Sequence, residues 1–168
     1  LPLQLDHDFQ VFAYSTFSGM AEVIRLTIES FSRCAMDDHR LIVKVHPWDT
    51  GLVDWSRVVR LVADEQGVSG RVDYLDGGSL DDLALHAEGM VTVNSTSGLH
   101  ALQVNCPVKV LGQAVYDVPG LTFQGELNAF WQSKELPNAE LLTAFVTLMA
   151  HTIQIRGVYF EEPGCTAA

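Results

Sequence analysis

The sequence predicts an α/β fold in which helices flank a Rossmann-like parallel sheet. Short apolar runs typical of buried strands alternate along the chain with longer runs whose apolar residues repeat at helical spacing, which is the pattern of βαβ units. A length of 168 residues, 48% of them hydrophobic and 18% charged, suits one folded domain. We expect that domain to cover residues 1–157, followed by a tail of residues 158–168 that is not fully ordered.

A strand, a helix and a second strand are predicted in the first 45 residues. Gln10–Tyr14 is the first strand candidate, and Leu41–Val45 is a short buried strand rich in Leu, Ile and Val. Ser18 is a cap candidate for the helix between them. The apolar residues of that helix share one face, at the spacing i, i+3, i+4, i+7: Met20, Val23, Ile24, Thr27, Ile28 and Phe31.

A second βα unit follows. Asp54 is predicted to cap its helix, and Gly67 offers a stop a few residues after the last apolar position. Val72–Leu75 is the third strand candidate. The residues that share the apolar face of this helix are Trp55, Val58, Val59 and Val62.

The elements in the middle of the chain are shorter. A helix over Leu80–Leu85 leads into a fourth strand at Met90–Val93. Leu99–Val104 is predicted to be helical and Pro107–Leu111 to be a fifth strand. Each boundary falls at glycine or small polar residues, which favour turns.

The pattern changes beyond Gly112. Residues 116–120 have loop chemistry, and no sustained period runs from there to Trp131, so we expect the sheet to end near this point. Ala139–Ile155 is predicted to be a terminal helix of about four turns. Its apolar set is Leu141, Leu142, Phe145, Val146, Met149 and Ile153.

The charge balance argues against nucleic acid as a partner. The chain carries 21 acidic and 10 basic residues, a formal net charge of -11, so a polyanion is repelled by the surface as a whole. A small phosphate ligand is compatible with this charge, because a helix N-terminus and one or two cationic side chains can hold it.

The cysteines and the N-terminus indicate a reducing, cytoplasmic location. Cys34, Cys106 and Cys165 lie far apart without CxxC spacing, which predicts neither a zinc site nor a disulfide framework. No apolar run of about 18 residues and no signal-peptide pattern is present. Because the chain begins Leu-Pro-Leu-Gln without an initiator methionine, we expect it to be a piece of a longer protein.

Polar residues follow several predicted strands at the point where each strand ends. In an open parallel sheet these ends meet at one edge, where ligands bind. The second strand leads to Lys44, His46 and Pro47, the third to Asp76–Gly78, and the fourth to a run from Asn94 to Gly98. The sequence therefore predicts an anion site at this edge.

Two interpretations stay open for the Ser95-Thr96-Ser97-Gly98 run. Its hydroxyls and backbone N–H groups suit a phosphate, but one hydroxyl caps the following helix equally well, and both can hold together. Pro47 fixes His46 at the rim, where the imidazole either binds phosphate together with Lys44 or serves as a structural hydrogen-bond partner.

Metal and nucleotide-fold motifs are missing from the sequence. The other histidines show neither H-x-E nor HExxH spacing, so we expect no metal site. No GxSxG, GxGxxG or P-loop arrangement occurs either.

Several linked motifs resemble the bacterial capsule polysaccharide biosynthesis and export family, whose members include the KpsC and KpsS type β-Kdo transferases. The likeness covers nearly the whole chain in order. The segments that carry it are Lys44–Pro47, Val91–Leu99, Pro107–Gly112 and Tyr116–Thr122, with support from Leu1–Gln4 and Phe130–Trp131.

The resemblance implies the C-terminal, nucleotide-binding half of a GT-B glycosyltransferase that uses CMP-Kdo as donor without a metal or another cofactor. Its partners would be a glycolipid or polysaccharide acceptor and an N-terminal domain absent from this chain. Association with the cytoplasmic face of the inner membrane, or with a capsule complex, would follow. The isolated chain would be inactive.

The resemblance also implies roles for particular residues. His46 would be catalytic and stabilise charge on the departing CMP phosphate, while Ser95 and Thr96 would hydrogen-bond its oxygens, assisted by the helix dipole. Gln4 and Asp6 would face the sugar or pack within a strand. Tyr116 and Asp117 would face the sugar or equally belong to a turn. The full nucleotide-binding set is Lys44, His46, Pro47, Asn94, Ser95, Thr96 and Gly98.

Two alternatives remain beside the transferase. One is a non-catalytic protein of capsule export or assembly that keeps the fold, and the other is a GT-B enzyme that uses a UDP-sugar. Fold likeness alone does not separate them, because one fold hosts many functions.

Overall fold

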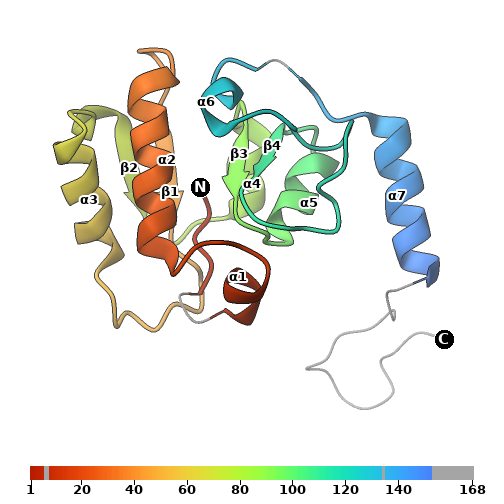
Figure 1. Ribbon diagram of the computed structural model, residues 1–168, viewed down its shortest axis with the longest axis horizontal. Coiled ribbons are helices and arrows are strands. Elements are labelled where there is room, and N and C mark those ends of the chain that lie inside the picture. The colour runs from red at the N-terminus through yellow and green to blue at the C-terminus, as the bar shows by residue number, and fades with distance from the viewer. Residues whose placement is uncertain (6–7, 134, 153–168) are drawn as a thin grey trace.

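Two parallel pairs of strands organise the computed structural model, which describes residues 1–5, 8–133 and 135–152 (Figure 1). Strand β1 (Leu41–Lys44) pairs with β2 (Val72–Leu75), and β3 (Met90–Thr92) pairs with β4 (Val108–Val110). A helix connects the strands within each pair, as parallel pairing requires. The Rossmann-like α/β fold and the four strands from β1 to β4 predicted from the sequence are confirmed.

Residues 1–4 run alongside β1 and occupy the place of a central strand. Leu3 donates its N–H to the Lys44 carbonyl (2.8 Å), and Lys44 donates to the Leu1 carbonyl (3.0 Å). Pro2 forms the parallel bridge to Lys44. On the other side, the side chain of Gln4 reaches Asn94, just beyond β3. The spatial order is therefore β2, β1, residues 1–4, β3, β4.

The predicted first strand at Gln10–Tyr14 is wrong, because this segment forms the short helix α1 (Phe9–Ala13). Residues 1–4 already pair with the free edge of β1, so a strand from Gln10 has no edge to join there. The segment closes instead as a single helical turn, in which the Ser15 hydroxyl donates to the Val11 carbonyl (2.5 Å). The Val11 side chain is buried.

Helix α2 (Met20–Cys34) buries the face that its spacing predicted. Gly19, rather than Ser18, is its N-cap residue, and no side chain caps the helix there. Ser18 instead donates from its backbone N–H (2.9 Å) and its hydroxyl (3.0 Å) to the Glu22 carboxylate. A carboxylate in the first turn suits the positive end of the helix dipole.

Helix α3 (Trp55–Glu65) begins and ends as the sequence predicted. The Asp54 carboxylate accepts a hydrogen bond from the Arg57 N–H (2.9 Å). Gly67 adopts a left-handed φ of 68°, which glycine reaches without a Cβ penalty, and so ends the helix.

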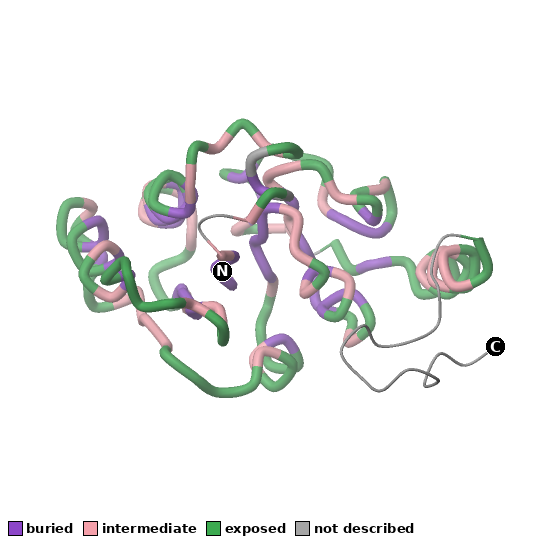
Figure 2. The backbone as a smooth tube through the Cα atoms, turned by 90° about the horizontal axis from the view of Figure 1, so that it is seen from below, coloured by how far each residue is buried: buried purple, intermediate pink, exposed green. Residues whose placement is uncertain are grey.

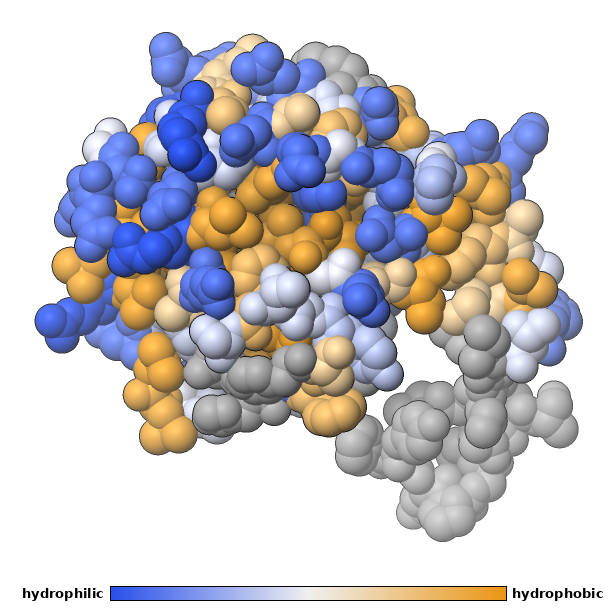
Figure 3. Space-filling model, in the orientation of Figure 1, coloured by the Kyte–Doolittle hydropathy of each residue, from blue (hydrophilic) through white to orange (hydrophobic). Residues whose placement is uncertain are grey.

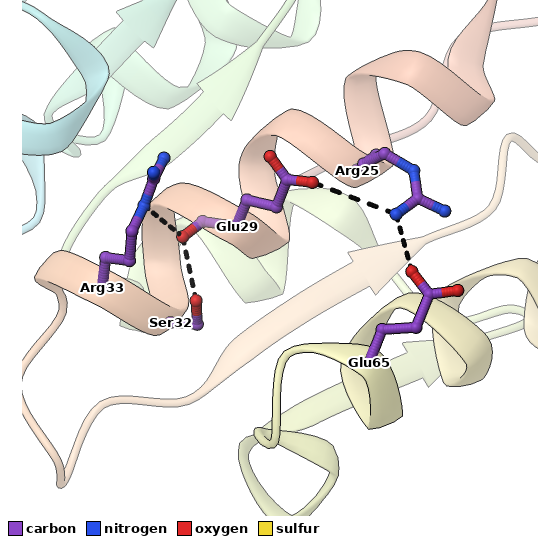
Figure 4. Close-up of polar contacts among 5 residues, drawn as sticks. All are labelled: Arg25, Glu29, Ser32, Arg33 and Glu65. Atoms are coloured by element: carbon purple, nitrogen blue, oxygen red, sulfur yellow. Dashed lines mark hydrogen bonds and ion pairs between the residues drawn. The ribbon is translucent and has the colours of Figure 1, made fainter.

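Helices α2 and α3 pack together with β1 in one apolar cluster that includes Ile24, Ile28, Val43 and Val59. On the surface, Arg25 joins the two helices through an ion pair with Glu65 (2.6 Å) and also lies 3.9 Å from Glu29 (Figure 4). About half of each Arg25 and Glu65 side chain is exposed, so the pair contributes little to stability beside the apolar contacts.

A second apolar cluster joins β3 and β4 to helices α4 (Leu80–His86) and α5 (Ser97–Gln103). Ser79 caps α4 by accepting from the Asp82 N–H (3.1 Å). Helix α5 begins two residues before the predicted Leu99. Figure 2 shows that the buried residues of the tube gather toward the middle of the molecule and that the loops are largely exposed.

The last described elements are α6 (Leu127–Phe130) and α7 (Ala139–Thr152). Helix α6 falls in the stretch for which the sequence predicted no regular element. Helix α7 starts at the predicted residue, none of its residues is fully buried, and it stands at one side of the molecule with apolar surface along it (Figures 1 and 3). The predicted end at Ile155 and the tail of residues 158–168 lie outside the described residues.

Candidate functional site

The carboxyl ends of the strands meet at one edge, as the parallel pairing requires. Along this sheet the strand order reverses between residues 1–4 and β3. In open α/β sheets ligands bind in the crevice at such a switch point. Gln4 and Asn94 stand at this position, and His46 follows β1 at the same edge.

A reciprocal pair of hydrogen bonds joins Gln4 to Asn94. The Gln4 amide Nε2 donates to Asn94 Oδ1 (2.9 Å), and the Asn94 backbone N–H donates to Gln4 Oε1 (3.1 Å). Gln4 is 6% exposed, so these bonds form largely out of water. Gln4 therefore fixes the start of the loop after β3. Asp6, its predicted companion, lies outside the described residues.

The hydroxyls after Asn94 close the first turn of α5. Ser95 Oγ accepts from the Ser97 N–H (3.2 Å) and from the Ser97 hydroxyl (2.9 Å). Thr96, the N-cap residue, is exposed and makes no side-chain capping bond. Ser95 thus closes a two-residue turn that leads into the helix, and Thr96 presents its side chain at the surface.

Tyr116 supports this loop from inside the protein. Its side chain is buried, and its hydroxyl donates a hydrogen bond to the Ser95 carbonyl. Burial, with a smaller contribution from Asp117, raises the pKa of the Tyr116 phenol well above its ordinary value, so the group stays a donor. The resemblance placed Tyr116 facing the sugar; the structure places it beneath the loop that carries Ser95.

Gly98 lies directly against the Tyr116 ring. A Cβ atom at residue 98 would be 2.8 Å from Tyr116 Cζ and 2.9 Å from Cε2, which is closer than real contacts allow. Gly98 is buried, so its side-chain-free backbone makes room for the ring.

Asp117 belongs to a turn. Its carboxylate accepts from the Thr122 hydroxyl (2.6 Å) and from Gln124 Nε2 (3.1 Å). These contacts tie together the loop after Tyr116, in which Gly120 has a left-handed φ of 87°. The turn interpretation of Asp117 accounts for both bonds.

Lys44 is buried rather than presented at the rim. Lys44 is 5% exposed, and its ammonium donates a long hydrogen bond to the Val45 carbonyl (3.5 Å). A joint contact of Lys44 and His46 with a bound phosphate stays a prediction.

The His46 ring is half-buried and held in one orientation. Its Nδ1 atom lies 3.1 Å from the Trp48 backbone N–H. An amide N–H can only donate, so Nδ1 accepts, and the neutral ring then carries its proton on Nε2. His46 therefore offers Nε2–H as a hydrogen-bond donor without needing to be charged.

Asp49 fixes the loop after His46, a role that the sequence reasoning missed. Its carboxylate accepts from the Gly51 N–H (2.9 Å) and from the Trp55 indole Nε1 (3.0 Å). The signal was present as an Asp-Thr-Gly turn before a tryptophan, because aspartate accepts bonds from the backbone two residues later. Beside it stand exposed Pro47 and Trp48, the latter 73% exposed.

The described residues include no group of three or more His, Cys, Asp or Glu side chains placed to bind a metal ion. Among the helices that the structure describes, none is both long and apolar enough to cross a membrane.

Comparisons with known proteins relate the chain to capsule polysaccharide proteins. The model of a family described as capsule polysaccharide biosynthesis protein matches residues 1–160. Capsule polysaccharide modification protein LipB of Neisseria meningitidis serogroup A is 37% identical over 163 residues, which are 96% of this chain and 39% of LipB. Capsule polysaccharide export protein KpsS of Escherichia coli is 35% identical over 158 residues, 94% of this chain and 41% of KpsS.

A more distant relative is protein FixF of Sinorhizobium fredii, which is 25% identical over 174 residues, covering 100% of this chain and 40% of FixF. The chain thus spans about two-fifths of the length of the curated relatives that it matches.

Proposed function

The chain belongs to the capsule polysaccharide biosynthesis protein family, and from that premise we propose that it is the nucleotide-binding half of a glycosyltransferase that uses CMP-Kdo. The whole protein would transfer the sugar to a glycolipid or polysaccharide acceptor at the cytoplasmic face of the inner membrane. The acceptor site would lie in a further domain, so the isolated chain binds nucleotide and transfers nothing.

The observation that carries this proposal is that His46 and the Asn94–Ser97 loop both follow parallel strands at the carboxyl edge, on the two sides of residues 1–4. Two independently buried supports hold the loop, namely the Gln4 amide and the Tyr116 hydroxyl. A site that binds an anion tightly needs donors that are already in place before the ligand arrives.

In the proposed site the His46 Nε2–H donates to a phosphate oxygen of the bound CMP. As the bond between the phosphate and the sugar breaks, negative charge gathers on that phosphate, and a hydrogen bond to the growing charge strengthens. The Thr96 hydroxyl and the one O–H of Ser95, whose oxygen already accepts two bonds from Ser97, donate to the same developing charge. Helix α5 has only seven residues, so we assign most of the stabilisation of the phosphate charge to these side chains and not to the helix dipole.

The remaining predicted residues take supporting parts in this proposal. Asn94 and Gly98 set the path of the loop, and Pro47 holds His46 at the rim. Lys44, the last residue of β1, is buried and makes no direct contact with the ligand. Gln4 and Tyr116 hold the loop that carries Asn94 and Ser95, and Asp117 holds the turn after Tyr116. In this proposal none of the three side chains touches the sugar.

Calorimetric titration of the purified chain with CMP, UMP and UDP tests the proposal. We expect CMP to bind more tightly than UMP or UDP, and His46→Ala to remove this binding. His151→Ala, which removes an exposed histidine on α7, is the matched control and should bind CMP as the unaltered chain does.

Other outcomes would contradict parts of the proposal. A preference for UDP would indicate a different donor class. Binding of a capsule glycolipid without any nucleotide would favour a non-catalytic export role, which the description of KpsS as an export protein also suggests for that relative. Equal CMP binding by the His46→Ala chain would place the nucleotide elsewhere.

A further inference from the structure

A cleft of about 920 Å³ lies between the two strand pairs, away from the candidate site. Residues of β1 and β3 line it on two opposite sides. The other two sides are apolar, with aromatic side chains from the end of α2 and the region after α6 on one, and α4 on the other. The residues that define these four sides are Ile42, Val91, Phe31, Trp131, Leu83 and Ala84.

On the β1 side the cleft exposes backbone hydrogen-bonding groups. The Leu1 nitrogen donates to the Ile42 carbonyl (2.7 Å), and Lys44 donates to the Leu1 carbonyl, so Ile42 and Lys44 point away from β2. The Ile42 N–H points to the same side as its carbonyl. Within the described residues it has no backbone acceptor.

On the β3 side the same alternation holds. The Met90 N–H donates to the Pro107 carbonyl (2.8 Å), and the Thr92 carbonyl accepts from the Leu111 N–H (2.9 Å), so Met90 and Thr92 face β4. Val91, between them, turns its N–H and carbonyl away from β4 and toward the cleft. Two strand edges therefore face each other across it.

Pro2 explains why residues 1–4 do not close this gap by themselves. Leu1 and Leu3 both point their N–H groups toward β1, so the backbone of Pro2 is turned toward β3. Proline has no N–H to donate there. Within the part of the chain that the structure describes, the Gln4 side chain bonds to Asn94 on the far side, at the carboxyl end.

We propose that this cleft is the seat of an additional parallel β-strand, in line with residues 1–4, supplied by polypeptide of the longer family proteins outside these 168 residues. The chain spans about two-fifths of its relatives, so such polypeptide exists in them. The inserted strand turns two pairs into one continuous sheet in the order β2, β1, inserted strand, β3, β4.

The walls of the cleft define the chemistry of the inserted segment. Apolar side chains cover both faces, so the segment is a continuous apolar run rather than an alternating one, as in parallel strands buried on both sides. The mouth is polar, with His39 and Glu88 3.6 Å apart across it, which marks where the segment meets solvent.

The test extends the full chain at Leu1 with Ile-Val-Ile-Val and compares it with a Gly-Ser-Gly-Ser extension of equal length. Residue-resolved hydrogen exchange measures the exchange rate of the Ile42 amide, and thermal unfolding measures the unfolding midpoint. We expect the apolar extension to slow exchange at Ile42 at least about tenfold and to raise the unfolding midpoint, with no change from the Gly-Ser extension.

Two results would overturn the proposal. One is unchanged exchange at Ile42 with either extension. The other is stabilisation by the apolar extension without protection of Ile42, which would indicate unspecific packing in the cleft. Light scattering on each sample distinguishes strand insertion within one molecule from pairing between molecules. Protection that occurs only in associated samples would also contradict the proposal. None of these readouts depends on nucleotide binding.

Discussion

Gln4 and Asn94 are joined by two hydrogen bonds although 90 residues separate them in the chain. This contact ties the end of the first extended segment to the loop after β3, at the point where the strand order reverses. The loop that carries Ser95 and Thr96 is thereby anchored to the centre of the sheet.

Replacing Gln4 with Ala should lower the free energy of unfolding by about 1–3 kcal/mol, because the substitution removes both hydrogen bonds from a buried position. Urea unfolding of Gln4→Ala, Asn94→Ala and the double variant measures the coupling between the two residues. We expect the double variant to lose clearly less than the sum of the single losses. Strict additivity would mean that the pair does not act as a unit.

Tyr116→Phe keeps the ring but removes the bond to the Ser95 carbonyl. If the loop must be held in place for the proposed site, CMP affinity should fall about fivefold to tenfold, equivalent to a hydrogen bond of about 1 kcal/mol. Calorimetry well below the unfolding temperature checks this. An unchanged affinity for CMP would mean that the Tyr116 hydroxyl contributes to stability and not to nucleotide binding.

Gly98→Ala should destabilise the protein by about 1–3 kcal/mol, because its Cβ would overlap the Tyr116 ring in a packed region. Gly70→Ala is the matched control, since a Cβ at residue 70 would meet no atom within 4 Å. Thermal unfolding should show a lower unfolding midpoint for Gly98→Ala and an unchanged midpoint for Gly70→Ala. Equal effects would indicate that the Tyr116 contact relaxes freely.

The His46 ring should be the Nε2–H tautomer when neutral, because Nδ1 accepts from the Trp48 N–H. Nitrogen chemical shifts of ¹⁵N-labelled histidine distinguish the two tautomers directly. His46→Ala supplies the assignment, since one set of signals disappears. A predominant Nδ1–H form would contradict the geometry on which the proposed donor role rests.

Cys106 should react with alkylating reagents only at unusually high pH. Burial raises the pKa of its thiol from 9.0 to about 11, and the Sγ atom lies near the Ala87 and Pro107 carbonyls (3.7 and 3.6 Å). The folded protein therefore holds the proton more tightly than the unfolded chain, so this contribution to stability is present below pH 9 and is lost between about pH 9 and pH 11.

Peptide mapping after alkylation measures this difference. Native protein at pH 9 should be modified at Cys106 far more slowly than protein unfolded in urea, in which about half of the thiol is ionised. Rapid modification of the native protein at that pH would show that the thiol is not shielded.

Local signals predicted most helices and strands because their causes are local. Helix α3 has its cap at Asp54 and its stop at Gly67, and both act within a few residues of the helix end. Ser18 was assigned the wrong role because Glu22 competes for the same helix end, and sequence alone does not rank the two.

The candidate site was predictable only in part. That His46 and the Ser95 loop lie at one edge follows from parallel strands, which the alternating pattern indicates. The burial of Lys44 and Tyr116 does not follow, because it depends on which distant segments pack against them. Nothing near Tyr116 in the sequence points to Ser95 or Gly98.

The sequence by itself determined the βα alternation, the apolar faces of α2 and α3 and the set of polar residues that follow the strands, since each depends on the chemistry of neighbouring residues. Only the tertiary structure decided that residues 1–4, and not residues 10–14, lie beside β1. Both segments have the local character of a strand, but β1 has one free edge. The segment that pairs with that edge becomes extended, and the other satisfies its backbone within a helical turn.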